Sequence, residues 1–251
     1  MVFVKQAYLR LGVNANLIYN RRPWIVGFAK SRISMNQAKE QLQASIEERI
    51  KKGLDTLNVS FGEDAIKKLI EYMQVLTQWN QTHNLTSVDD VDEMLSVHIL
   101  DSASIRPYVK GGTLLDVGSG AGLPGIILAI LSPALDVTSV ESRGKKAQFQ
   151  KYVANKLNLK NFQVENTRIE EFDPKDKFAN VVARAFSNIE DFVKGSKQAI
   201  APNGRWLAMK GAVPEDELKT LKKMGYKSDT YALKVPELGA QRNLIVIEAR
   251  K

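Results

Sequence analysis

The stretch that decides the fold is "TLLDVGSGAGLPGIILAI", which runs from Thr113 to Ile130. It begins as an apolar run, breaks into closely spaced glycines, and then becomes apolar again at helical spacing. This order predicts a β-strand, a glycine loop and a helix, with the loop open to close approach by a ligand. A tight strand–helix turn needs small residues as well, so the surroundings of the loop must identify the ligand.

Strand-like and helical stretches alternate downstream of the loop. We expect strands at Thr113–Val117, Val137–Glu141, Phe162–Glu165, Asn180–Ala183 and Arg205–Met209, and helices at Ile126–Leu131, Lys145–Leu157 and Ile189–Ile200. Such alternation predicts an α/β fold in which helices cover both faces of a parallel sheet. The final runs "YKSDTYALKV" and "RNLIVIEAR" have no long helix between them, which indicates an antiparallel pair at the sheet edge.

The chain before the loop carries a helical pattern. Apolar residues recur at the offsets that mark one face of a helix, namely Leu42, Ile46 and Ile50, and then Ile66, Leu69, Ile70, Met73 and Leu76. A third helix is expected from near Asp89 to just before Pro107. We therefore predict a helical N-terminal region over residues 35–108 and an α/β domain over residues 109–251.

Composition excludes several classes of chemistry. The 251 residues include no cysteine and only His83 and His98, which excludes disulfides and cysteine-bound zinc and argues against a histidine-rich metal site. No apolar run approaches the roughly 18 residues that a membrane span needs. We expect a soluble protein that uses no metal.

The net charge of +8 is unevenly distributed. Residues 1–34 contain six basic residues and no acidic one, which leaves 30 basic against 28 acidic residues in the rest of the chain. This N-terminal stretch fits an extension outside the fold, or an acid-free arm for targeting or RNA binding. The main body is only mildly basic, so any RNA-binding surface should be a local patch; its candidates are Lys145, Lys146, Lys151, Lys194, Lys197 and Arg205.

Two cofactors fit the glycine loop. "GAGLPG", residues 120–125, matches GxGxxG, and Glu141 ends the second expected strand, where a carboxylate can accept hydrogen bonds from ribose hydroxyls. Both NAD and S-adenosylmethionine (SAM) satisfy this pattern. Asp116, at the strand end where the glycines begin, would repel a pyrophosphate but favour the cationic part of SAM. Charge therefore favours SAM over NAD.

The blocks "WNQTHNLTSV", "HILDS", "DVGSGAGLPGI", "TRIEEF", "VVARAF" and "LAMKG", in this order, resemble the GidB/RsmG family of bacterial small-subunit ribosomal RNA methyltransferases. The resemblance covers residues 35–251 and implies a Rossmann-like SAM-binding fold, methylation of a guanine N7 in 16S ribosomal RNA, and a cytoplasmic monomer. It places the family's cofactor contacts on Gly118, Leu123, Ile169, Glu170 and Arg184. Gly120, Gly122, Asp116 and Glu141 join this expected cofactor site by their positions.

Roles for the remaining polar residues follow from their places. Arg184 ends the fourth strand and is expected to orient the cofactor or the guanine, while Lys210, at the end of the fifth strand, is a weaker candidate for a phosphate contact. Asn80 and Asn84 should tie down the loop after the second helix. His98 and Asp101, three residues apart on a helix, are expected to make structural contacts.

The residues leave other functions open. Guanine N7 carries a lone pair in its neutral form, so direct in-line transfer from SAM needs no general base, which agrees with the absence of an obvious one. An NAD-dependent oxidoreductase, a methyltransferase acting on a small molecule and an RNA-binding module without activity remain as alternatives. The expected partner is small-subunit ribosomal RNA, unpaired at the target, or a precursor particle, with no membrane contact.

Overall fold

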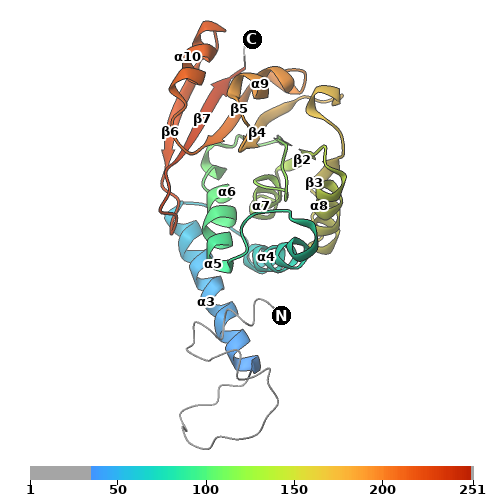
Figure 1. Ribbon diagram of the computed structural model, residues 1–251, viewed down its shortest axis with the longest axis vertical. Coiled ribbons are helices and arrows are strands. Elements are labelled where there is room, and N and C mark those ends of the chain that lie inside the picture. The colour runs from blue at the N-terminus through green and yellow to red at the C-terminus, as the bar shows by residue number, and fades with distance from the viewer. Residues whose placement is uncertain (1–34, 250–251) are drawn as a thin grey trace, which may run out of the picture.

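The computed structural model describes residues 35–249, so the predictions for residues 1–34 lie outside the described part. Seven strands form one sheet in the order β3-β2-β1-β4-β5-β7-β6 (Figure 1). Strands β1 to β5 pair in parallel, and β7 pairs antiparallel with both β5 and β6. The strands are β1 Thr113–Val117, β2 Asp136–Val140, β3 Phe162–Glu165, β4 Phe178–Arg184, β5 Ile200–Lys210, β6 Ser228–Leu233 and β7 Arg242–Glu248. The parallel sheet with an antiparallel edge is the one predicted.

One predicted helix is wrong at its C-terminal end. Helix α9 covers Ile189–Gly195 rather than extending to Ile200, and Ile200 is the first residue of β5. Apolar residues continue at helical spacing up to Ile200, but Ser196 ends the helix and its backbone N–H and hydroxyl both return to the Phe192 carbonyl. The chain then enters β5, which is longer than the predicted strand.

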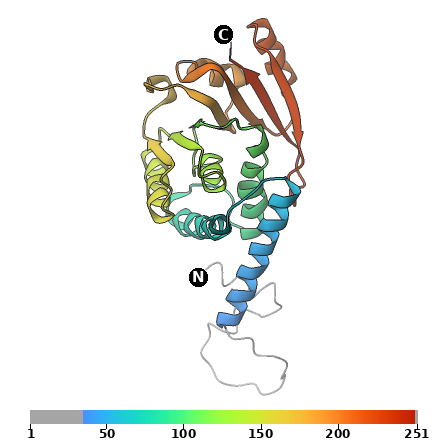
Figure 2. The same cartoon turned by 180° about the vertical axis from the view of Figure 1, so that it is seen from behind.

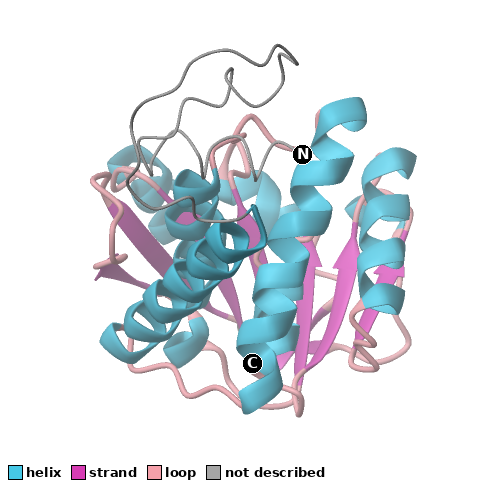
Figure 3. Cartoon of the chain, turned by 90° about the horizontal axis from the view of Figure 1, so that it is seen from below, coloured by secondary structure: helices cyan, strands magenta, loops and turns pink. Residues whose placement is uncertain are grey.

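Helices cover both faces of the sheet (Figures 1 and 2). Helices α7 Gly125–Leu131 and α8 Gly144–Lys156 pack on one face together with the N-terminal helices, and α9 packs on the other with α10 Glu215–Lys223. Each face of the sheet has its own hydrophobic core, and successive β1 residues point to alternate faces. Leu114 belongs to the core under α7 and α8, and Leu115 to the core under α9 and α10. The result is a three-layer arrangement, and Figure 3 shows helices lying in front of the strands of the sheet.

The N-terminal region consists of α3 Met35–Thr56, α4 Glu63–His83 and a third, irregular helix. That third helix is α-helical at α5 Val91–Met94, π-helical at η1 Leu95–Leu100 and α-helical again at α6 Asp101–Ala103, and a 3₁₀ turn, η2 Arg106–Tyr108, follows. The three predicted helices are therefore present, although the sequence pattern did not indicate the π-helical part. Their apolar faces share one hydrophobic core with α7, α8 and the sheet.

Candidate functional site

The glycine loop leaves β1 in a conformation that suits glycine. Gly118, Gly120 and Gly122 have φ angles of 65°, 59° and 81°, in the left-handed region that other residues rarely adopt. A Cβ added at Gly118 would meet nothing within 4 Å, and one at Gly120 would meet only the Lys146 Nζ, at 3.7 Å. The loop therefore presents bare backbone to open space at these two residues, as the sequence predicts.

Asp116 lies behind the loop. Its side chain is fully buried, and its Oδ2 accepts a hydrogen bond from the Gly125 backbone N–H at 2.8 Å. Its Oδ1 is buried without a hydrogen-bond partner among the described residues. Burial raises the pKa of Asp116 to about 7, although the Gly125 hydrogen bond and the charge of Arg184 act against this. The loop covers the carboxylate in this structure, and the expected effect of Asp116 on a cofactor stays a prediction.

Polar contacts from three elements hold the loop in place. Glu141, directly after β2, accepts from the Gly120 N–H through Oε2 and from the Arg143 N–H through Oε1, both at 2.8 Å. From α8, Gln150 donates to the Gly120 carbonyl at 2.9 Å, and from α4 the Tyr72 hydroxyl donates to the Ala121 carbonyl at 2.9 Å. Burial raises the pKa of Tyr72, so its hydroxyl remains a donor. The loop is preorganised by contacts with α4 and α8 that the sequence did not indicate.

These features fit SAM. The open backbone at Gly118 and Gly120 allows close approach, and each Glu141 oxygen, having accepted one N–H, keeps a lone pair for a ribose hydroxyl. When Asp116 is ionised, its unpartnered oxygen places negative charge behind the loop, which suits a cationic ligand better than a pyrophosphate. The buried Leu123, in the same loop, stays a predicted packing contact.

Ile169 and Glu170 lie on a 3₁₀ turn, η3 Ile169–Glu171, after β3. Ile169 is buried in the core under α9, and its carbonyl accepts from Gln198 Nε2 at 2.6 Å. Glu170 is exposed, and a Cβ added at Gly195 would lie 3.6 Å from its Oε1. Within the described chain, no hydrogen bond joins this turn to the glycine loop, so the two cofactor contacts stay predictions.

Arg184 is held at the end of β4 by the irregular helix. Its Nη1 donates to the Val97 carbonyl at 2.8 Å and lies 3.5 Å from Asp101 Oδ2. The π-helical turn makes this possible, because the Asp101 N–H bonds to the carbonyls of Ser96 and His98 instead of Val97. Arg184 is therefore neither a free strand-end side chain nor a solvated one. It stands at the carboxyl edge between β1 and β4, where parallel sheets of this order bind ligands.

His98 and Asp101 make the structural contacts expected of them. The Nε2 of His98 lies 2.9 Å from the Thr86 hydroxyl, and burial lowers the pKa of His98 to about 4, with Arg184 adding to the effect. Asp101 is buried and also pairs with Arg242, whose Nε donates to its Oδ1 at 3.1 Å. Sequence reasoning missed Arg242, because the first residue of a strand-like run gives no sign of a partner 141 positions away.

The expected phosphate contact of Lys210 stays a prediction, and the structure gives this lysine two partners within the fold. Its Nζ lies 3.1 Å from Glu217 Oε2 on α10 and donates to the Phe186 carbonyl at 3.1 Å. Its side chain is only 13% exposed. Lys210 therefore connects α10 to the loop after β4. Its charge is paired with the carboxylate of Glu217, which lies outside the "LAMKG" motif.

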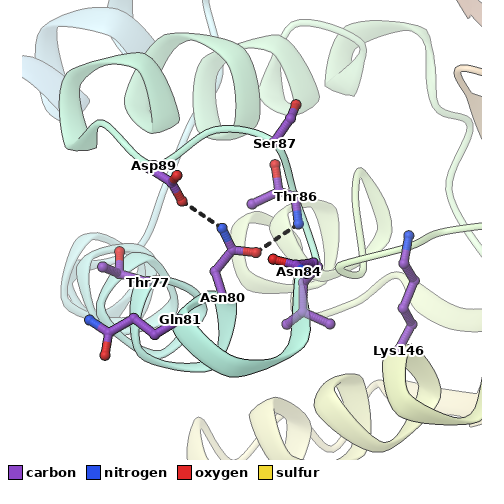
Figure 4. Close-up of a pocket in the computed structure, with 9 residues that line it drawn as sticks. Thr77, Asn80, Gln81, Asn84, Thr86, Ser87, Asp89 and Lys146 are labelled. Carbon is purple, nitrogen blue, oxygen red and sulfur yellow. Dashed lines mark hydrogen bonds between the residues drawn. The ribbon is translucent and has the colours of Figure 1, made fainter.

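A polar pocket of about 830 Å³ opens beside the glycine loop (Figure 4). It is lined by the end of α4, the loop that follows, and Lys146 at the start of α8. Asn80 fixes its floor: its Oδ1 accepts from the Thr86 N–H at 2.9 Å and its Nδ2 donates to Asp89 at 2.7 Å. Asn84 ends α4 in a left-handed conformation. Both asparagines thus shape the loop, as predicted.

The predicted basic patch is divided. Lys145 and Lys146 begin α8 at the carboxyl edge of the sheet, with Lys151 farther along the same helix. Lys194 pairs with Glu190 on α9, and Arg205, in the middle of β5, donates to the Tyr108 carbonyl. The six residues therefore do not form one surface.

No group of three or more acidic or histidine side chains in the described range could hold a metal ion. None of the helices within residues 35–249 is long and apolar enough to cross a membrane.

The fold defines the class. It is the Rossmann-like fold of SAM-dependent methyltransferases, with the glycine loop after β1. A SAM-dependent methyltransferase from Aquifex aeolicus has a TM-score of 0.51 over 66% of this chain and 97% of its own, at 16% identity. A SAM-dependent O-methyltransferase from Thermotoga maritima has a TM-score of 0.51 over 65% of this chain and 71% of its own, at 17% identity. At these identities the likeness confirms the predicted fold alone.

Sequence comparison defines the family. Residues 65–246 match the family described as rRNA small subunit methyltransferase G. The protein named ribosomal RNA small subunit methyltransferase G from Methylobacillus flagellatus is 42% identical over 206 residues, which cover 82% of this chain and 100% of the relative. The protein of the same name from Pseudomonas aeruginosa is 42% identical over 80% of this chain and 94% of its own. The chain therefore belongs to the rRNA small subunit methyltransferase G family, which confirms the resemblance seen in its motifs.

Proposed function

We propose that this protein transfers the methyl group of SAM to N7 of an unpaired guanine in the 16S ribosomal RNA of the small subunit. The observation that carries the proposal is the open glycine loop beside a polar pocket, in a chain of the rRNA small subunit methyltransferase G family. The partner is small-subunit ribosomal RNA or a precursor particle, and the enzyme acts as a cytoplasmic monomer.

The chain's own residues bind and orient the cofactor. Gly118 and Gly120 let the methionine part pass close to the main chain, and Glu141 accepts hydrogen bonds from the ribose. Asp116 acts through its field from behind the loop rather than by contact. When bound, SAM supplies an electrophilic methyl group on a positively charged sulfur.

Methyl transfer to N7 proceeds without a general base. The neutral guanine already has an in-plane lone pair at N7, so no proton has to leave before attack. His98, on the irregular helix that contacts Arg184, is buried, and its lowered pKa keeps it neutral. Its Nε2 contacts the Thr86 hydroxyl, which suits a structural role. Catalysis is then mainly alignment of N7, the methyl carbon and sulfur in line, and well-oriented reactants of this kind save roughly 7–11 kcal/mol.

The pocket between α4 and α8 receives the guanine. It is polar and it shares Lys146 with the open side of Gly120, so a base there lies next to the bound cofactor. The base must be unpaired, because the major groove of an RNA duplex, where N7 lies, is too narrow for a protein pocket. Any arginine that contacts the base must reach O6 or a phosphate only, because a bidentate contact would occupy the N7 lone pair.

Two measurements test this function. Small subunits from cells lacking the protein are incubated with it and SAM, and the RNA is cleaved chemically at N7-methylguanine. One new cleavage site is expected, and none in a reaction without SAM. Calorimetric titration should show binding of SAM and not of NAD. Methylation at another atom, or NAD binding in place of SAM, would overturn the proposal.

A further inference from the structure

One buried carboxylate holds two arginines at the carboxyl edge of the sheet. Asp101, 2% exposed on α6, accepts from Arg242 Nε at 3.1 Å through Oδ1 and faces Arg184 Nη1 at 3.5 Å through Oδ2. The two arginines come from different strands, β7 and β4. Asp101 therefore fixes the position of one guanidinium relative to the other.

Arg184 and Arg242 lie at the ends of different strands along this edge, Arg184 at the end of β4 and Arg242 at the start of β7. Arg184 is close enough to Asp116 and His98 for its charge to lower the pKa of both groups. Arg242 begins β7, whose next residue, Asn243, pairs with Lys210 at the end of β5. Arg242 is therefore at the outer rim of the edge whose interior contains the glycine loop.

Arg242 has donors left for a ligand. Its Nε bonds to Asp101 and its Nη1 to the Gln241 carbonyl at 2.9 Å, while its Nη2 has no acceptor among residues 35–249. The side chain is 23% exposed, so this nitrogen can be reached from solvent. Two arginines against one carboxylate leave a net charge of +1, which matches the single negative charge of a phosphodiester.

We propose that Arg242 binds a phosphodiester of the RNA close to the target guanine, and that Asp101 is a positioning residue which keeps this contact in register with Arg184. The inference rests on the proposed function, since it names a contact for the RNA substrate. A guanidinium suits this role because its planar set of N–H donors matches phosphate oxygens. Thr86, in the guanine pocket, contacts His98 on the same helix as Asp101, so the pocket and the phosphate contact share one support.

The first experiment measures RNA binding as a function of salt. The probes are a 12-nucleotide single-stranded RNA that contains guanine and small subunits from cells lacking the protein. Arg242→Gln should bind both about tenfold more weakly at low salt, and the slope of log K against log salt should fall by about 0.7, the loss of one single-strand phosphate contact. Lys175→Gln, an exposed lysine before β4 at the opposite edge, is the matched control for charge and should keep the slope.

The second experiment separates positioning from charge. Asp101→Asn removes a negative charge, so RNA affinity at low salt should not fall, yet single-turnover methylation should fall at least tenfold because the arginines lose their shared carboxylate. Should this variant fail to fold, Arg242→Lys serves instead: it keeps the charge and the salt slope but loses the Nε donor, and turnover should again fall.

The outcomes discriminate clearly. An unchanged salt slope in Arg242→Gln overturns the phosphate contact, and if SAM affinity falls in that variant, Arg242 belongs to the cofactor's carboxylate. Normal turnover in Asp101→Asn or in Arg242→Lys overturns the positioning role. Failure of the proposed function would look different, because the wild-type protein would then leave guanine N7 unmethylated while the salt slopes still reported the Arg242 contact.

Discussion

Replacing Asp116 by asparagine should make the protein more stable at alkaline pH. The carboxyl group is fully buried with one oxygen unpartnered, and burial raises its pKa from 3.8 to about 7. Between these two values the folded protein holds a proton that the unfolded chain has released. The free energy of unfolding of the wild type therefore decreases as the pH rises through this window.

The size of the effect follows from the shift. Between pH 5 and pH 8 the unfolded chain stays ionised while the folded protein loses its proton near pH 7, so ionisation of Asp116 costs the wild type about 3 kcal/mol, at about 1.36 kcal/mol for each pH unit. Asp116→Asn does not titrate, and its side-chain oxygen can still accept the Gly125 N–H. Its free energy of unfolding, relative to wild type, should rise by about 3 kcal/mol from pH 5 to pH 8.

Urea unfolding of both proteins at the two pH values, without SAM and at constant ionic strength, measures this difference. Other titrating groups contribute equally to both proteins and cancel. Asp136→Asn, which removes an exposed carboxylate at the start of β2, is the control for loss of one negative charge. A relative change below about 1 kcal/mol for Asp116→Asn would refute the view that a buried charge is held behind the loop at a cost to stability.

Three further substitutions test the site. Gly120→Val should abolish SAM binding by calorimetry because its side chain enters the open face of the loop, and it should lower the melting temperature while leaving the protein folded, because a β-branched residue is strained at a φ of 59°; unchanged SAM affinity would reject the loop as the cofactor site. Arg184→Ala should slow single-turnover methylation roughly 10- to 150-fold and also lower the melting temperature, because the Val97 carbonyl loses its donor; near-normal turnover would contradict this role. Gly125→Ala places a Cβ 2.7 Å from Asp116 Oδ2 and should cost about 1–3 kcal/mol in urea unfolding, whereas wild-type stability would show that the loop can relax.

The sequence predicted the sheet because local pattern decides its strands. Four of the five predicted parallel strands agree with the structure to within about two residues at either end, and the glycine loop lies where the apolar run stops. The helix predicted to reach Ile200 failed because Ala199 and Ile200 continue the apolar spacing of α9, although they lead into a buried strand. Periodicity cannot distinguish a helical face from a short apolar run in another element.

Contacts between distant segments could not be predicted in the same way. Asp101 was expected to be structural, but its partners are 83 and 141 residues away, so nothing near it in the sequence names them. Lys210 was expected at a phosphate, and the sequence did not indicate its partner in the fold, Glu217, which lies on α10. The sequence shows which residue type stands at the end of a strand. It does not show which side chain that residue contacts, because the contact depends on tertiary packing.

The helical region forms a wall of the site, because it shares a hydrophobic core with the sheet and hydrogen bonds connect the two. Two buried side-chain atoms without partners in the described chain, Ser102 Oγ and Asp116 Oδ1, lie on the irregular helix and at the end of β1. Each costs about 1–3 kcal/mol, and natural sequences keep such defects mainly where function requires them. Two hydrogen bonds connect the helical region to the α/β domain: Tyr72 of α4 donates to the glycine loop, and Arg184 of β4 donates to the Val97 carbonyl. Residues 109–249 by themselves would lose the supports of both the loop and Arg184, so the change in sequence pattern near residue 108 marks a change of secondary structure and not a boundary at which the site can be divided.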